Sequence, residues 1–186
     1  MKIILINGKA RSGKDFASQI LLKKLKNSKK LAFADKIKTL ICDIFNITLE
    51  EFNDFKNNHY DLKYNDKSLT FRELIQNFGE SSKDLFGKDF WINQIINDIE
   101  SSKEDYIIIS DFRFLIEYET LVKYFGKDKI VSLHIQDKNL ENFENNDTHI
   151  SENNLKGFEF DYVIDNSIKD PEILEDYLKS FINLKL

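Results

Sequence analysis

A glycine-bracketed loop near the amino terminus constrains this chain more than any other feature. Gly8 and Gly13 enclose four residues and are followed by Lys14, which is the spacing G-x-x-x-x-G-K. The loop follows the apolar run 3–6 and precedes an amphipathic stretch at 15–25, the strand, loop and helix order that a phosphate-binding P-loop requires. Its members are Gly8, Lys9, Ala10, Arg11, Ser12, Gly13, Lys14 and Asp15. The alternative is an ordinary strand-to-helix turn that contains two glycines.

The residue types in this loop suit a phosphate group. Gly8 and Gly13 allow the backbone to turn so that successive N–H groups point at one anion. The helix start adds a partial positive charge, and Lys14 brings a mobile ammonium group to the β- and γ-phosphates. Asp15 stands where a hydroxyl residue usually meets Mg²⁺. Its carboxylate could serve as a metal ligand, cap the helix, or hold Lys14 or Arg11.

Composition excludes several classes of protein. The net charge of −5 argues against a protein that coats a nucleic-acid polymer, because that task needs a basic surface. We expect no membrane association, since no apolar run approaches the roughly 20 residues of a membrane span. The single cysteine, Cys42, excludes an internal disulfide, and its apolar neighbours predict a buried thiol. The chain enters a strand at once, so we expect no signal peptide and a cytoplasmic location.

Arginine is scarce and therefore informative. The chain has 27 basic residues, and the arginines among them are Arg11, Arg72 and Arg113. The guanidinium group is a planar, permanently charged fork that suits phosphate. These three positions are therefore candidates for phosphate contacts, against the alternative of three solvated charges.

Hydrophobic periodicity predicts strands that alternate with helices. The predicted strands are 2–7, 31–34, 106–109, 130–135 and 162–164. The predicted helices are 13–26, 35–45, one starting near 48, 70–78, 89–99, 115–125 and 171–181. Residues 56–68 are expected to form an irregular loop. Asp35 is a plausible N-cap, and Thr48 and Glu51 have the spacing of a capping box.

This alternation predicts an α/β fold with a parallel sheet and helices on both faces. Right-handed crossovers place the carboxyl ends of the strands at one edge of the sheet. The glycine loop, Asp35, Asp111 and Asn166 are expected to meet at that edge.

Two further constellations carry chemistry. Asp111 follows a buried strand, where P-loop enzymes place a carboxylate that positions Mg²⁺, although it could instead cap the next helix. Arg72 and Gln76 are four residues apart on one predicted helix face, which suits a phosphate and a base edge. Trp91 suits either core packing or stacking on a base.

Together these motifs resemble the deoxynucleoside monophosphate kinases of bacteriophages, within the P-loop NMP-kinase-like superfamily. The resemblance covers residues 2 to about 178. It rests on the motifs at 8–15, 33–38, 72–79, 89–91, 111–114, 149–152 and 160–166.

The resemblance implies transfer of the γ-phosphoryl group of ATP to the 5′-phosphate of a dNMP, with Mg²⁺ held near Asp15 and Asp111. It also implies roles for individual residues. Lys14, Arg11 and the loop amides would hold ATP, and Asn166 and Ser167 would lie near adenine. The acceptor would meet Asp35, Lys36, Lys38, Arg72, Gln76, Trp91, Arg113, His149 and Glu152.

The implied architecture is a single P-loop kinase domain over 1–186, a three-layer fold with a five-stranded parallel sheet. Its core comprises 1–46, 104–136 and 158–186, with an acceptor-binding insertion at 47–103 and a lid at 137–157. The resemblance also suggests a homodimer, with nucleotides as partners, in the host cytoplasm if the protein is viral.

The chain departs from the family pattern in two places. Phe16 stands where the family usually has a hydroxyl residue, and the polar stretch after Gly79, which often holds an arginine in relatives, offers Lys83 as its nearest cation. The predicted lid also has no arginine, which leaves Lys138, Lys156 and His149 as substitutes. Two alternatives therefore stay open. One is a P-loop kinase for another small phosphorylated acceptor such as phosphomevalonate, and the other is a nucleotide-binding module without catalysis.

Overall fold

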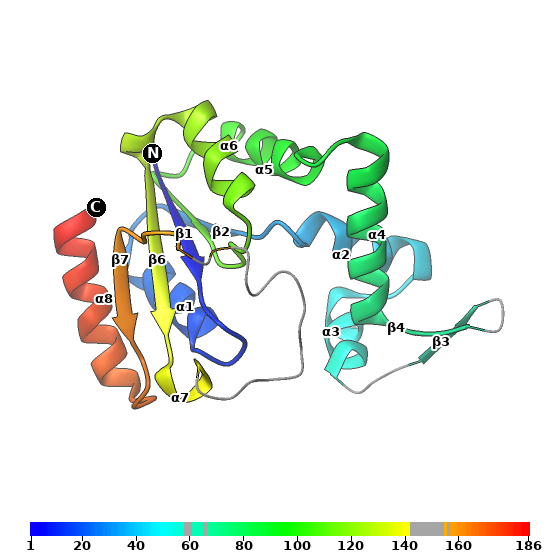
Figure 1. Ribbon diagram of the computed structural model, residues 1–186, viewed down its shortest axis with the longest axis horizontal. Helices are drawn as coiled ribbons and strands as arrows, with labels where there is room; N and C mark the ends of the chain where they lie inside the picture. The colour runs from blue at the N-terminus through cyan, green and yellow to red at the C-terminus, as the bar shows by residue number, and fades with distance from the viewer. Residues whose placement is uncertain (58–60, 65–66, 142–154, 156) are drawn as a thin grey trace. The chain divides into compact units, whose positions relative to one another are not determined.

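A five-stranded, fully parallel sheet organises the fold (Figure 1). The computed structural model describes residues 1–57, 61–64, 67–141, 155 and 157–186. The strand order is β2-β5-β1-β6-β7. The strands are β1 (Lys2–Asn7), β2 (Ser28–Leu31), β5 (Tyr106–Ile109), β6 (Ile130–Gln136) and β7 (Tyr162–Asp165). The predicted α/β fold with a five-stranded parallel sheet is confirmed.

Helices cover both faces of the sheet, because the crossover from β1 to β2 and the crossover from β5 to β6 run in opposite directions across it. On one face, α1 (Lys14–Lys24) and α8 (Pro171–Lys185) pack on alternate strand residues such as Ile4 and Ile6. α6 (Leu115–Phe125) contacts β6, and a 3₁₀ turn η1 (Lys127–Lys129) follows it. None of the described helices is long and apolar enough to cross a membrane.

The chain divides into two compact units. The sheet unit comprises 1–32 and 95–186, and the helical unit comprises 33–94. The helical unit lies between β2 and β5 in sequence and includes α2 (Asp35–Phe45), which the predicted division into a core at 1–46 and an insertion at 47–103 assigned to the core. Its other elements are α3 (Leu49–Asn57), β3 (Asp61–Tyr64), β4 (Lys67–Thr70), α4 (Phe71–Phe86) and the start of α5 (Phe90–Glu100).

Phenylalanine side chains form the core of the helical unit. The ring of Phe71 packs edge-on against Phe52 and Phe45, with centroids 5.3 and 5.9 Å away, and Phe52 and Phe71 are almost fully buried. Cys42 belongs to the same core, and its burial raises the pKa of the thiol, as predicted for a structural cysteine. The capping box of α3 is confirmed, since Thr48 Oγ1 accepts from the Glu51 amide and Glu51 Oε2 accepts from the Thr48 amide.

Three local predictions are wrong. The second strand ends at Leu31 rather than running from 31 to 34, because it is an edge strand that exposes Lys29 and Lys30 and so lacks an apolar signature. The predicted loop at 56–68 contains β3 and β4, which pair as an antiparallel hairpin. Asp35 is not the N-cap of α2 but its first residue, and Ala34 is the N-cap. The Asp35 carboxylate instead accepts a hydrogen bond from Lys38 on the same helix.

Candidate functional site: the glycine loop and the strand ends around it

The predicted phosphate-binding loop lies between the end of β1 and the start of α1. Gly13 is the N-cap of α1 and has a φ of 100°, and Arg11 has a φ of 66°. Glycine adopts this left-handed region freely, whereas a residue with a side chain must be held there by its surroundings. The loop therefore turns sharply and presents the N-terminus of α1, whose partial positive charge can stabilise an anion.

Gly8 is packed so closely that no side chain fits at its position. A Cβ atom there would lie 2.4 Å from Ser12 Oγ and 2.7 Å from the carbonyl oxygen of Ile135. The Ser12 hydroxyl group is itself fully buried and has no hydrogen-bond partner within the described parts of the chain. Position 8 therefore requires glycine for a steric reason, because the loop passes close to β6.

Hydrogen bonds to loop carbonyls hold the backbone of the glycine loop. The carbonyl oxygen of Lys9 accepts from the Ser12 amide at 3.1 Å and from Lys14 Nζ at 3.4 Å. The carbonyl oxygen of Gly13 accepts from the Ala17 amide at 2.9 Å within the first turn of α1. These bonds close a turn over residues 9–12 and place Lys14 against the loop that it follows.

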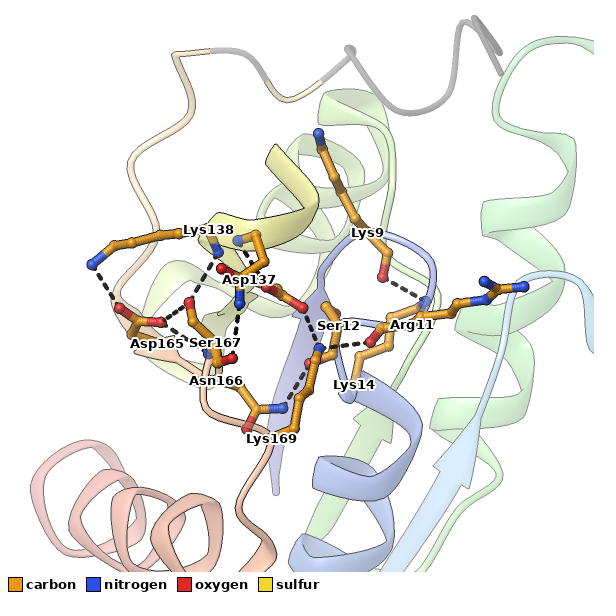
Figure 2. Close-up of polar contacts among 11 residues, drawn as sticks. Lys9, Arg11, Ser12, Lys14, Asp137, Lys138, Asp165, Asn166, Ser167 and Lys169 are labelled. Carbon is orange, nitrogen blue, oxygen red and sulfur yellow. Dashed lines mark hydrogen bonds and ion pairs between the residues drawn. The ribbon is translucent and has the colours of Figure 1, made fainter. Parts of the chain in front are cut away.

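Two side chains from the segment after β7 hold the remaining part of the loop (Figure 2). Asn166 Nδ2 donates to the carbonyl oxygen of Ser12 at 2.8 Å, and Lys169 Nζ donates to the carbonyl oxygen of Arg11 at 2.8 Å. Asn166 is buried, and its backbone N–H group donates to the carbonyl oxygen of Gln136 at 2.8 Å. Asn166, predicted to lie near adenine, therefore contacts the glycine loop directly.

A buried carboxylate follows β6 at the same edge. Asp137 is only 3% exposed and forms an ion pair with Lys169. Burial alone would raise its pKa, but the hydrogen bond and charge of Lys169, with the amides of Asn139 and Leu140, outweigh burial and lower the pKa. Asp137 is therefore held in its charged form beside the glycine loop.

The segments that follow β6 and β7 are joined by a polar network (Figure 2). Lys138 Nζ lies 2.6 Å from Asp165 Oδ2, and the Lys138 amide donates to Ser167 Oγ at 3.0 Å. The hydrogen bond from Lys138, followed by those from Ser167, lowers the pKa of Asp165 to about 2. The Asn139 side chain donates to the carbonyl oxygen of Ser167 at 3.0 Å. Ser167 thus belongs to an ordered strand-end network next to the loop.

The segment after β5 lies on the other side of β1. Asn7, the last residue of β1, donates from Nδ2 to the carbonyl oxygen of Phe112 at 2.8 Å, while its Oδ1 meets His134 Nδ1 of β6 at 2.8 Å. Asp111, partly buried, directly precedes Phe112. The glycine loop, Asp111 and Asn166 thus follow the carboxyl ends of β1, β5 and β7 in one parallel sheet, whereas Asp35, which was expected at the same edge, belongs to the helical unit.

Glu117 orients the backbone at Arg113. Its Oε2 accepts from the amides of Arg113 and Phe114 at 2.8 and 3.0 Å, in front of the first turn of α6. The N-cap of α6 is Phe114, so Asp111 is not the helix cap that was its alternative role. The guanidinium-bearing side chain of Arg113 is exposed.

Asp15 has a partner that the sequence analysis did not foresee. Its carboxylate lies 3.8 Å from Lys30 Nζ of β2, and its side chain is 74% exposed. Asp15 lies in the first turn of α1 and not at the N-cap, so it complements the helix dipole without capping the helix. An exposed pair of this length contributes little stability, which leaves the carboxylate available to other partners.

The predicted acceptor residues of the helical unit lie on three helices. Asp35 and Lys38 pair at 2.9 Å on α2, next to the exposed Lys36. Arg72, which is exposed, and Gln76, which is half-buried, share α4. α4 starts at a capping box between Thr70 and Glu73, a T-x-x-E signal that the sequence analysis did not use.

Trp91 serves the packing of the helical unit. Its ring lies 4.8 Å from that of Phe90 and 6.3 Å from that of Phe78, and its Nε1 donates to the carbonyl oxygen of Gly79 at 3.2 Å. These contacts favour core packing over base stacking, the two roles left open above. His149 and Glu152 lie outside the described residues.

Asp137 and Lys169 are the site residues that sequence reasoning missed. Asp137 directly follows β6, so the rule that selected Asp111 at the end of a buried strand could have selected it too. Lys169 has no such signal, because its φ of 60° and its contacts appear only in the folded chain.

A family model matches this chain, and two of the solved structures that align with it do so over almost its whole length. The family model described as deoxynucleotide monophosphate kinase matches residues 46–177, which begin after the glycine loop. An unliganded sugar kinase from a Janibacter species aligns over 99% of this chain and 95% of its own, with 14% identity and a TM-score of 0.45. Shikimate kinase from Bacteroides thetaiotaomicron aligns over 98% of this chain and 97% of its own, with 12% identity and a TM-score of 0.41. The comparison with curated proteins found no match.

Proposed function

This chain belongs to the deoxynucleotide monophosphate kinase family, and we propose that its glycine loop binds the ATP from which the phosphoryl group is taken. The family activity is transfer of a phosphoryl group from ATP to a dNMP, which gives dNDP and ADP. The observation that carries the proposal is the loop at 8–13, which joins a buried strand to the N-terminus of α1. The loop lies outside the residues that match the family model, so it is independent support.

On the ATP side, the loop amides, Lys14 and Arg11 bind the phosphates. Lys14 starts α1 and already contacts the loop through the carbonyl oxygen of Lys9, so its ammonium group is close to where the phosphates would lie. Asn166 and Ser167 lie in the network after β7 and border the site. Asn166 acts on the loop through the Ser12 carbonyl group, and its place near adenine, with that of Ser167, remains part of this proposal.

On the acceptor side, Arg72 and Arg113 grip the dNMP phosphate, with Asp35, Lys36, Lys38 and Gln76 around the nucleoside. Support comes from arginine at these positions in a chain whose remaining basic residues, apart from Arg11, are lysine, and from the pair of Arg72 and Gln76 on α4. His149 and Glu152, together with the lid over 137–157, are further parts of this proposal.

The chemistry needs no side-chain nucleophile, because the acceptor phosphate oxygen is already anionic. The protein positions the two substrates and neutralises the charges that would otherwise keep two phosphates apart. Arginine and lysine side chains supply that neutralisation, and exclusion of water prevents loss of the phosphoryl group to hydrolysis.

Mg²⁺ fits the oxygen donors at this edge of the sheet. Within the described parts of the chain no group of three or more acidic, histidine or cysteine residues could enclose a metal ion. Mg²⁺ bound with nucleotides needs only one or two carboxylates, because phosphate and water oxygens complete its shell. We assign Asp111 and Asp15 to this role. When bound, Mg²⁺ would neutralise charge on the transferred phosphoryl group.

A panel assay tests the proposal. ADP formation is measured with Mg-ATP and each of dAMP, dCMP, dGMP, dTMP, the four NMPs and phosphomevalonate. We expect turnover on one or more dNMPs and a loss of about 100-fold or more in Lys14→Ala, since Lys14 meets charge that develops in the transition state. Lys23→Ala, an exposed lysine on the same helix, should match the wild type. Activity on phosphomevalonate alone, or ATP binding without turnover, would overturn the proposal.

The same resemblance suggests an oligomeric state and a location. We propose a homodimer in the cytoplasm, or the host cytoplasm for a viral protein. Light scattering coupled to gel filtration measures the mass directly, and a mass near the 22.0 kDa of one chain would reject the dimer.

A further inference from the structure

Lys169, which is paired with Asp137, contacts the glycine loop, and the kinase mechanism above gives this contact no role. Lys169 follows β7, and its Nζ lies between the carboxylate of Asp137 and the carbonyl oxygen of Arg11, as Figure 2 shows. It links three strand ends, those of β1, β6 and β7, through one ammonium group.

The backbone at Lys169 indicates that this contact is not incidental. Lys169 has a φ of 60°, in the left-handed region that side-chain-bearing residues rarely adopt. Such a conformation persists only where surrounding contacts hold it, and it is concentrated at functional sites. Here the ion pair with Asp137 and the bond to Arg11 supply those contacts.

Both contacts from this segment act on neighbouring peptide units of the loop. In a trans peptide the carbonyl and amide groups point in opposite directions. The bond from Lys169 to the Arg11 carbonyl therefore orients the Ser12 amide, which closes the turn onto Lys9. The bond from Asn166 to the Ser12 carbonyl orients the Gly13 amide in the same way.

The charge of Asp137 explains why a lysine stands at position 169. A buried carboxylate beside a site for a triphosphate would repel that ligand and would be costly to bury alone. The ammonium group of Lys169 neutralises it while donating to the loop. Removal of Lys169 would therefore have two separable effects: an unpaired buried charge and a loop peptide without its donor.

We propose that Lys169, held by Asp137, is a positioning residue that sets the glycine loop in its ATP-binding conformation. The inference rests on the proposed binding of ATP at this loop. Its rival is a purely structural ion pair, in which any effect on ATP follows from lost stability.

A double variant separates the two roles. Lys169→Met should lower the thermal midpoint and weaken ATP binding about tenfold, the effect of losing one charge-assisted hydrogen bond. Lys169→Met with Asp137→Asn removes the unpaired charge, so the midpoint should recover while the ATP dissociation constant stays raised about tenfold. Isothermal titration with Mg-ATP, well below every midpoint, measures the affinity, and KM for the dNMP should not change.

Lys179→Met is the control for loss of a lysine–aspartate pair, because Lys179 lies 2.8 Å from Asp176 in a solvent-exposed pair on α8, away from the loop. Its ATP affinity should equal that of the wild type. An ATP dissociation constant within twofold of the wild type in Lys169→Met, or one that recovers together with stability in the double variant, would overturn the proposal. A wild type that binds ATP but phosphorylates no dNMP would reject the kinase function, while the ATP affinities would still decide the role of Lys169.

Discussion

The side-chain amide of Asn166 donates to the carbonyl oxygen of Ser12 at 2.8 Å, across 154 positions of the chain. A Cβ atom on Gly13 would lie 2.4 Å from the same Asn166 nitrogen. Asn166 therefore occupies the space beside Gly13. The glycine loop and the segment after β7 pack closely against each other at this point.

Replacement of Asn166 by alanine should loosen the glycine loop. The variant leaves the Ser12 carbonyl group without its donor, at a cost of about 1–3 kcal/mol for an unsatisfied buried group. We expect KM for ATP to rise while KM for the dNMP stays within twofold, as steady-state kinetics would measure. Asn53→Ala, on the exposed side of α3, is the control. Equal changes in both KM values would argue against a local effect on the loop.

Replacement of Gly8 by alanine should destabilise the protein. The added methyl group would meet Ser12 Oγ at 2.4 Å and the Ile135 carbonyl oxygen at 2.7 Å, and overpacking of this kind costs roughly 1–3 kcal/mol. Urea denaturation measures the change in the free energy of unfolding.

Ser12→Ala supplies the matching background for that experiment. The Ser12 hydroxyl has no partner within the described residues, so its removal should leave stability unchanged or raise it slightly. In this background Gly8→Ala should cost less, because one of its two close contacts is gone. A cost that is the same in both backgrounds would show that Ile135 alone excludes the side chain.

Glu117→Ala should weaken acceptor binding through the backbone of Arg113. The change removes the acceptor of two amides, those of Arg113 and Phe114, and should cost about 1–3 kcal/mol of stability. If Arg113 grips the dNMP phosphate, KM for the dNMP rises and KM for ATP does not. Glu119→Ala, exposed on the same helix, should behave as the wild type. Lost stability with an unchanged KM for the dNMP would disconnect Arg113 from the acceptor.

Asp161 should make stability dependent on pH at the acidic end. Burial alone would raise its pKa, but hydrogen bonds from Ser132 and Lys127 outweigh burial and lower it. A lowered folded-state pKa contributes stability that is complete above the unfolded pKa of about 3.9 and is lost as pH falls through the folded pKa. Asp161→Asn should therefore cost about 1–2 kcal/mol at pH 7, after allowance for solvent screening of this partly exposed group.

Urea denaturation of wild type and Asp161→Asn between pH 7 and pH 3 measures that dependence. The difference in the free energy of unfolding should hold above about pH 5 and shrink below about pH 4. Asp54→Asn, an exposed residue of α3, provides the baseline. A difference that grows on acidification would mean that the sign of the pKa shift is wrong.

Local sequence patterns predicted most of the sheet unit. Tyr106–Ile109 and Leu115–Phe125 were predicted with the bounds that the structure shows, because a continuous apolar run and a helical period are both local signals. The hairpin of β3 and β4 was missed, since its pairing depends on contacts between strands rather than on composition. The shift of β2 has the same origin, because an edge strand is selected by its neighbour β5.

The sequence by itself determined the parallel α/β fold, the glycine loop and the family, because spacing along the chain encodes each of them. Only the tertiary structure decided that Asn166 and Lys169 hold the loop, that Asp137 is buried against Lys169, and that Asp15 meets Lys30. The physical reason is that a parallel sheet gathers strand ends from distant parts of the chain at one edge. Which side chains then meet depends on burial and charge, which no local pattern contains.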